Sequence, residues 1–148
     1  YDTRLDSKNF AEEAAKVLAE AGLKVLIFDR YSPVPLLSYT VRELHCDGGI
    51  VITASHNTKA YNGFKTYEAS GAQMGPNKTE EIFRWMLKKA DPLDVPHCDD
   101  LAQENIEWIG EEIAEKFTNA AADCSKLNDS SAKKDLSVVY TPLFGSGR

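Results

Sequence analysis

A short apolar run that breaks directly into polar residues is the feature that most constrains this chain. Residues 49–52 (GIVI) are β-branched after the glycine and have the length of a buried strand. Residues 53–57 (TASHN) follow at once, so a hydroxyl, an imidazole and an amide stand at the end of that strand. In open α/β sheets, ligands bind beyond the carboxyl ends of the strands. The pattern therefore predicts an α/β domain with a ligand site around Ser55.

Helix and strand patterns alternate along the rest of the chain, which is typical of α/β folds. Helical spacing of apolar residues predicts helices over 9–21, from Pro35 to about 45, over 79–90 and over 109–124. Strands are predicted at 23–28, at 64–67 after an Asn62-Gly63 hairpin turn, and at 136–140. Ser7 or Asn9 is expected to cap the first helix, and Gly22 to end it. Four large aromatic residues are expected to pack in the core or between helices: Phe83, Trp85, Trp108 and Phe117.

Composition excludes several classes of protein. The 148 residues, 43% of them hydrophobic, suffice for one domain with a real core. No apolar run approaches the roughly 20 residues that span a bilayer, so no membrane partner is expected. With a net charge of −6 and no basic stripe, a nucleic-acid partner is not expected either. The three cysteines, an odd and sparse count, suit a reducing compartment and predict a cytoplasmic protein.

Two His-Cys pairs, at 45–46 and 97–98, invite a zinc interpretation. Their spacing matches no compact metal motif, and adjacent residues of a strand or helix point apart. The pairs are therefore interpreted as incidental.

The Ser55 segment resembles the phosphoserine signature of the phosphoglucomutase/phosphomannomutase family, the α-D-phosphohexomutases. That family carries T-A-S-H-N-P, then Y-N-G-x-K and G-x-Q; this chain has residues 53–57, 61–65 and 71–73 in the same order. Three further segments match: 1–4 (YDTR) resembles the end of an early strand, 33–38 a helix entry, and 140–145 the strand that begins the second domain. Thr58 departs from the pattern, because the family usually has proline there.

The resemblance implies a three-layer α/β/α fold with a mixed sheet, that of the family's first domain, truncated at its N-terminus. Residues 1–134 would form this domain, without its first strand or strands, plus a linker at 127–134. Residues 135–148 would open domain II. Domains II–IV of the same chain would then be its missing partners. We expect residues 1–148 alone to be inactive.

The resemblance also implies an activity and roles for particular residues. A phosphohexomutase moves a phosphoryl group reversibly between the 1- and 6-positions of a glucose or mannose phosphate, or the 1- and 5-positions of a pentose. Ser55 would be the nucleophile and phosphoryl carrier, and would bind Mg²⁺ through its phosphate oxygen. His56 and Lys65 would assist in catalysis, and Arg4, Asn57 and Lys59 would bind phosphate. The family's other magnesium ligands lie in a D-G-D-G-D-R loop of domain II, and a glucose 1,6-bisphosphate-type activator is implied.

Two other functions remain to be compared with this one. The chain could be a phosphosugar-binding or scaffold module without catalysis. It could also be a hydrolase that uses Ser55 as nucleophile and His56 as base. The hydrolase interpretation is disfavoured because neighbouring side chains rarely aim at each other and no G-x-S-x-G elbow surrounds the serine.

Overall fold

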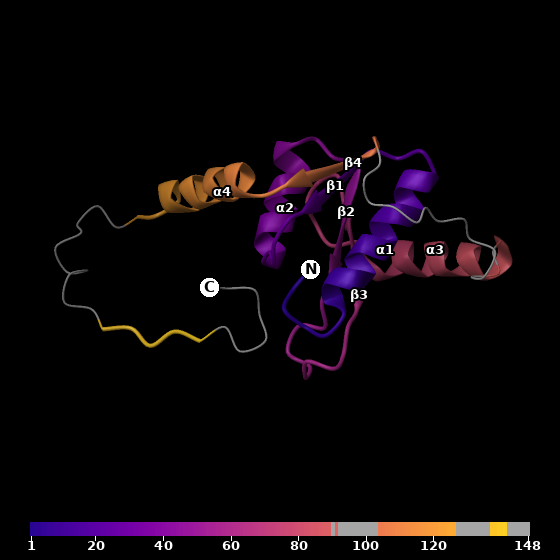
Figure 1. Cartoon of the computed structure of the whole chain (residues 1–148), viewed down its shortest axis with the longest axis horizontal. Coiled ribbons are helices and arrows are strands. Elements are labelled where there is room, and N and C mark those ends of the chain that lie inside the picture. The colour runs from indigo at the N-terminus through magenta and orange to yellow at the C-terminus, as the bar shows by residue number, and fades with distance from the viewer. Residues whose placement is uncertain (90, 92–103, 127–136, 142–148) are drawn as a thin grey trace.

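The computed structural model describes residues 1–89, 91, 104–126 and 137–141 (Figure 1). Within them, helices and strands alternate as the sequence predicts. The elements in chain order are α1 (Ser7–Glu20), β1 (Val25–Phe28), α2 (Val34–Glu43), β2 (Gly48–Ile52), β3 (Phe64–Glu68), α3 (Pro76–Lys89), β4 (Ile106–Ile109) and α4 (Glu111–Asp123).

The four described strands form two hydrogen-bonded pairs. β1 runs parallel to β4, with Val25 opposite Ile106. β2 runs antiparallel to β3, with Ile52 opposite Phe64. The predicted mixture of strand directions is therefore present, although hydrogen bonds join the described strands only within each pair.

Successive side chains of β1 pack against helices on opposite faces of the strands, which gives the molecule three layers. Ile27 packs on one face of the strands, in a buried cluster with Ala15 and Ala19 of α1. Phe28 points to the other face, where it packs with Leu36 of α2 and Ile113 of α4. Successive strand residues point to opposite faces, so a single strand supplies both layers of core. Figure 1 shows α1 and α2 on opposite sides of the strands. The predicted α/β/α architecture is confirmed.

The two ends of α1 are determined differently from each other. Gly22 ends the helix as predicted: its φ is 81°, which glycine adopts without steric cost, and its N–H donates to Ala19 O at 2.9 Å. The predicted caps at the other end are wrong. Asp6 occupies the N-cap position and makes no side-chain capping bond. Ser7 is instead a buried residue of the first turn, and its hydroxyl donates to Ile52 O at 2.9 Å.

The helix predicted from residue 109 begins later. Ile109 is the last residue of β4, and Gly110 separates that strand from α4. The helical spacing between Ile109 and Ile113 indicated a helix, but Ile109 ends a four-residue strand. This strand depends on pairing with β1, which the sequence pattern does not show. Trp108 lies on this strand and is 43% exposed, so its predicted place in the core is wrong.

Helix α3 also differs from the prediction. It begins at Pro76, one turn earlier than expected, and proline suits the first position of a helix. Phe83 and Trp85 are 56% and 62% exposed, so the prediction that they pack in a core is wrong for the structure described here. The prediction for Phe117 is confirmed, because its ring packs against Tyr39 with centroids 5.6 Å apart.

Several predictions fall in parts of the chain with little or no described structure. Residues 92–98, which include the second His-Cys pair, and the linker predicted at 127–134 lie outside the described residues. Residues 137–141 belong to no strand, so the strand predicted at 136–140 is wrong for its described residues. The second domain predicted to begin at residue 135 stays a prediction. Among the described helices, none is both long and apolar enough to cross a membrane.

Candidate functional site

The structure places the hydroxyl of Ser55 against the side chain of Lys65. Ser55 follows the carboxyl end of β2 and has a φ of 54°, a left-handed conformation that is uncommon for a residue other than glycine. Lys65 lies on β3, where it pairs with Val51 of β2. Its Nζ lies 2.7 Å from Ser55 Oγ. An ammonium group donates a hydrogen bond to the nucleophile that the sequence predicts.

The chain reverses between β2 and β3 through a longer loop than the sequence indicates. The predicted two-residue turn at Asn62-Gly63 is wrong, because residues 53–63 form the whole connection. Two tight turns lie within it: Asn57 N–H donates to Ala54 O at 3.0 Å, and Tyr61 N–H donates to Thr58 O at 3.1 Å.

Gly63 is required for close backbone packing and not for a two-residue turn. A Cβ atom there would meet Thr53 O at 2.8 Å. The glycine permits the two backbones to approach where the loop closes, and Thr53 N–H donates to Gly63 O at 2.9 Å.

Arg4 binds this loop from the buried side. Its side chain has an exposed fraction of 0%. Nη1 donates to the carbonyl oxygens of Asn57 and Thr58, each at 2.7 Å, and Nη2 donates to that of Ser55. Nη1 also lies 3.3 Å from Tyr61 O. The guanidinium therefore binds several backbone carbonyls of the loop, and its predicted contact with a phosphate stays a prediction.

Asp2 and Thr53 complete the support of the loop. The Asp2 carboxylate is buried and lies 3.0 Å from Arg4 Nε. Thr53 Oγ1 donates to the same carboxylate at 2.7 Å and accepts the backbone N–H of Ser55 at 3.1 Å. Both residues lie inside the matching segments, 1–4 and 53–57, but no role was expected for either. Only the folded chain shows that the first residues reach the end of β2.

The other predicted site residues lie on the exposed surface of the loop. His56, Asn57 and Lys59 are all exposed. None of their side chains contacts Ser55 through a hydrogen bond or ion pair among the described residues. Asn57 takes part in the loop through its backbone N–H, which donates to Ala54 O. These three side chains are free to meet a ligand that approaches Ser55 from solvent.

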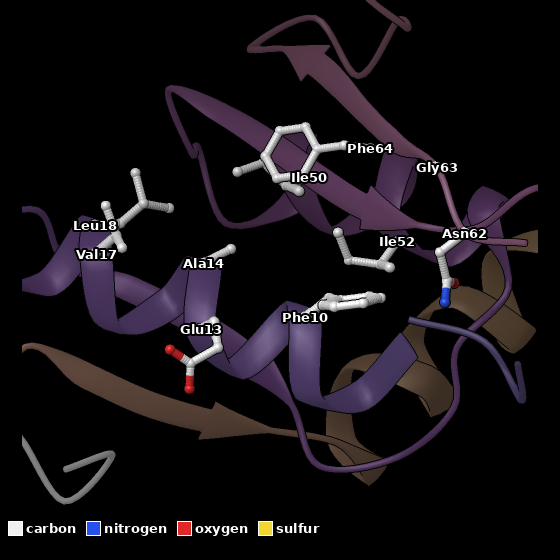
Figure 2. A pocket seen from close by; sticks show the side chains of 10 residues that line it. All are labelled: Phe10, Glu13, Ala14, Val17, Leu18, Ile50, Ile52, Asn62, Gly63 and Phe64. Carbon is white, nitrogen blue, oxygen red and sulfur yellow. The ribbon is translucent and has the colours of Figure 1, made fainter. Parts of the chain in front are cut away.

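A cavity of about 530 Å³ lies elsewhere, between α1 and the β2–β3 pair (Figure 2). Its lining is almost entirely apolar and includes Phe10, Ile52 and Phe64. Phe64 and Lys65 are adjacent on β3, so they point to opposite faces, one into the cavity and the other toward Ser55. The cavity is therefore separate from the site, and none of the described lysine, arginine or histidine residues lines it.

Comparison with known proteins agrees with this geometry. Residues 1–92 match the family model described as phosphoglucomutase/phosphomannomutase, alpha/beta/alpha domain I. The chain belongs to the phosphoglucomutase/phosphomannomutase family. It is 38% identical over 151 residues to a phosphoglucomutase of Staphylococcus haemolyticus and 36% identical over 153 residues to one of Staphylococcus aureus strain MRSA252. Each alignment covers 99% of this chain, but only 27% and 26% of those relatives.

Among solved structures, the chain is similar to a phosphomannomutase-like protein of Thermus thermophilus. The TM-score is 0.60 and the sequence identity 32%, over 74% of this chain and 23% of that one. This chain thus spans about a quarter of the length of the family members that it matches.

The described residues do not by themselves fit the magnesium ion expected for this family. They contain no group of three or more His, Cys, Asp or Glu side chains that could hold a metal. The Asp2 carboxylate, the acidic group of the site, is already bound to Arg4 and Thr53. A phosphate oxygen on Ser55 is the ligand that this part of the chain could add to a site completed by other residues.

Proposed function

We propose that the chain is the first domain of a phosphohexomutase, and that Ser55 carries the phosphoryl group. The reaction would be reversible transfer between the 1- and 6-positions of a glucose or mannose phosphate, or between the 1- and 5-positions of a pentose phosphate. Residues 135–148 would open the second domain of a longer protein. The observation that carries the proposal is the 2.7 Å contact between Lys65 Nζ and Ser55 Oγ at the end of β2.

In the first half-reaction, a sugar hydroxyl attacks the phosphorus atom of phosphorylated Ser55. The bond between phosphorus and Ser55 Oγ breaks, and the developing charge on Oγ is stabilised by a proton from Lys65. His56, exposed beside Ser55, is our candidate to take the proton of the attacking hydroxyl. The products are a sugar bisphosphate and a free serine.

The second half-reaction reverses these roles after the sugar bisphosphate has reoriented in the site. Ser55 Oγ attacks the other phosphate, and neutral Lys65 accepts the serine proton. The proton held by His56 returns to the departing sugar oxygen, and the sugar monophosphate leaves with its phosphate at the new position. Lys59 and Asn57 would contact the phosphate from the exposed loop, and a magnesium ion bound elsewhere would neutralise charge on the transferring group. A bisphosphate such as glucose 1,6-bisphosphate would restore any Ser55 that had lost its phosphate.

The test uses the complete protein that carries this chain, incubated with a hexose 1,6-bisphosphate and measured by intact-mass spectrometry. The wild type should gain one phosphoryl group, and Ser55→Ala should gain none and lose mutase turnover. Ser70→Ala, which removes an exposed hydroxyl outside the loop, is the matched control and should behave as the wild type. Mutase turnover by Ser55→Ala would contradict the proposal. Binding of the sugar without phosphate on Ser55 would favour the scaffold alternative.

A further inference from the structure

Two hydrogen-bonded routes from the peptide groups of Ser55 converge on one carboxylate oxygen. The backbone N–H of Ser55 donates to Thr53 Oγ1, which donates to Asp2 Oδ2 at 2.7 Å. The carbonyl of Ser55 accepts from Arg4 Nη2, and Nε of the same guanidinium lies 3.0 Å from Asp2 Oδ2. Both peptide groups of the serine are therefore fixed through Asp2.

The Asp2 carboxylate is well placed to hold these routes rigidly. Its other oxygen, Oδ1, accepts the backbone N–H of Arg4 at 3.1 Å and lies 3.1 Å from Ser7 Oγ. Asp2, Arg4, Ser7 and Thr53 are all buried. Buried charge-assisted hydrogen bonds are stronger than neutral ones, and a fully satisfied network rigidifies its surroundings.

Ser55 needs such support because of its backbone conformation. A φ of 54° is unfavourable for a residue with a Cβ atom, and such conformations persist only where surrounding contacts enforce them. Without its two partners, Ser55 would relax to an ordinary conformation. Its Oγ would then move away from Lys65.

We propose that Asp2 is a positioning residue for phosphoryl transfer, which acts on Ser55 through Thr53 and Arg4. The inference rests on the proposed role of Ser55 as phosphoryl carrier. Asp2 does not touch the phosphoryl group. It fixes the serine in the conformation in which its hydroxyl meets Lys65, and thereby raises the rate of transfer without contributing to sugar binding.

The experiment removes one route with a matched set of threonine variants in the complete protein. Thr53→Val keeps the shape of the side chain but loses the hydroxyl, whereas Thr53→Ser keeps the hydroxyl. Thr40→Val is the control, because Thr40 is equally buried and its hydroxyl bonds Leu36 O within α2, away from the loop. The rate of Ser55 phosphorylation by a hexose 1,6-bisphosphate is followed with the KM for that sugar.

Thr53→Val should lower kcat about tenfold, because it removes the hydroxyl that links Ser55 N–H to Asp2 and with it both hydrogen bonds of that hydroxyl, with little change in KM. Thr53→Ser should restore most of the rate, and Thr40→Val should keep the rate of the wild type. Asp2→Asn should lower kcat further. Because it also leaves the Arg4 charge incompletely paired and can impair folding, the positioning role is tested with the threonine variants. A Thr53→Val protein that is phosphorylated as fast as Thr40→Val overturns the inference.

Amide hydrogen exchange at Ser55 separates failure of this inference from failure of the proposed function. If the wild type takes up no phosphate, the function proposed for Ser55 is wrong, whatever Asp2 does. In that case, the exchange rate of the Ser55 amide alone tests whether the Asp2 network positions the serine. It should exchange faster in Thr53→Val than in Thr53→Ser, and equal exchange in the two variants overturns the inference.

Discussion

Lys65 donates a hydrogen bond to the hydroxyl of Ser55, ten residues earlier in the chain, over 2.7 Å. The contact joins the loop that follows β2 to the second residue of β3, its antiparallel neighbour. Since an ammonium group has three donors and no acceptor, it stabilises negative charge on Ser55 Oγ directly.

Replacing Lys65 with methionine should therefore slow phosphoryl transfer while leaving the fold intact. We expect kcat to fall by about a hundredfold or more, the range typical of a lost acid–base group. The measurement is the rate of phosphate exchange at Ser55 in the complete protein. Lys78→Met is the control, because Lys78 forms an exposed ion pair with Glu68 far from the serine. Equal rates in the two variants would remove Lys65 from the mechanism.

Replacing Arg4 should destabilise the fold far more than replacing another arginine with acidic partners. Arg4→Met leaves the buried Asp2 carboxylate without its guanidinium partner, which costs about 3–5 kcal/mol. Arg30→Met removes an exposed arginine that pairs with Asp29 and Glu111, and because solvent screens such pairs the loss of stability should be much smaller. Urea unfolding of both variants measures the difference, and similar midpoints would contradict this account of Arg4.

Two glycines with left-handed backbones should respond differently to alanine. Gly71 has a φ of 77°, and a Cβ there would meet Ser38 O at 2.6 Å. Gly71→Ala should lower the free energy of unfolding by about 2–4 kcal/mol, because overlap adds to the conformational cost. Gly22 has a φ of 81° and open space around it, so Gly22→Ala should cost only about 1 kcal/mol. Chemical denaturation tests this order, which a larger loss in Gly22→Ala would refute.

The two described cysteines should differ in reactivity. Burial raises the pKa of the Cys46 thiol, and nearby Asp47 raises it further. A raised pKa leaves less thiolate at a given pH, and the thiolate is the reactive form. In a Cys98→Ser background at pH 8, iodoacetamide should modify exposed Cys124 before Cys46. The rate at Cys46 should keep rising beyond the ordinary thiol pKa of about 8.5; a plateau below that pH would contradict the shift.

The sequence could predict local structure and the proximity of Ser55 and Lys65. Helical spacing and Gly22 define α1 because the interactions involved lie within a few residues. Strand β4 could not be found in this way, since its four residues become a strand only by pairing with β1, some eighty positions earlier.

At the candidate site too, local features could be predicted from the sequence, whereas contacts between distant segments could not. The motif placed Lys65 near Ser55, although through a turn that the chain does not make. The partners of Arg4 could not be predicted, because they are backbone carbonyls more than fifty positions away. A sequence records side chains, whereas this loop is held largely through its main chain.

The dependence of the Ser55 loop on residues 1–5 limits how the loop can be transplanted. Leu5 N–H donates to Lys59 O, Asn62 donates to Leu5 O, and Arg4 and Asp2 hold the turns between. Copying residues 53–65 onto another scaffold would transfer the reactive groups but not their arrangement. An engineered Ser–Lys site of this kind would need both segments, with the strands that bring their ends together.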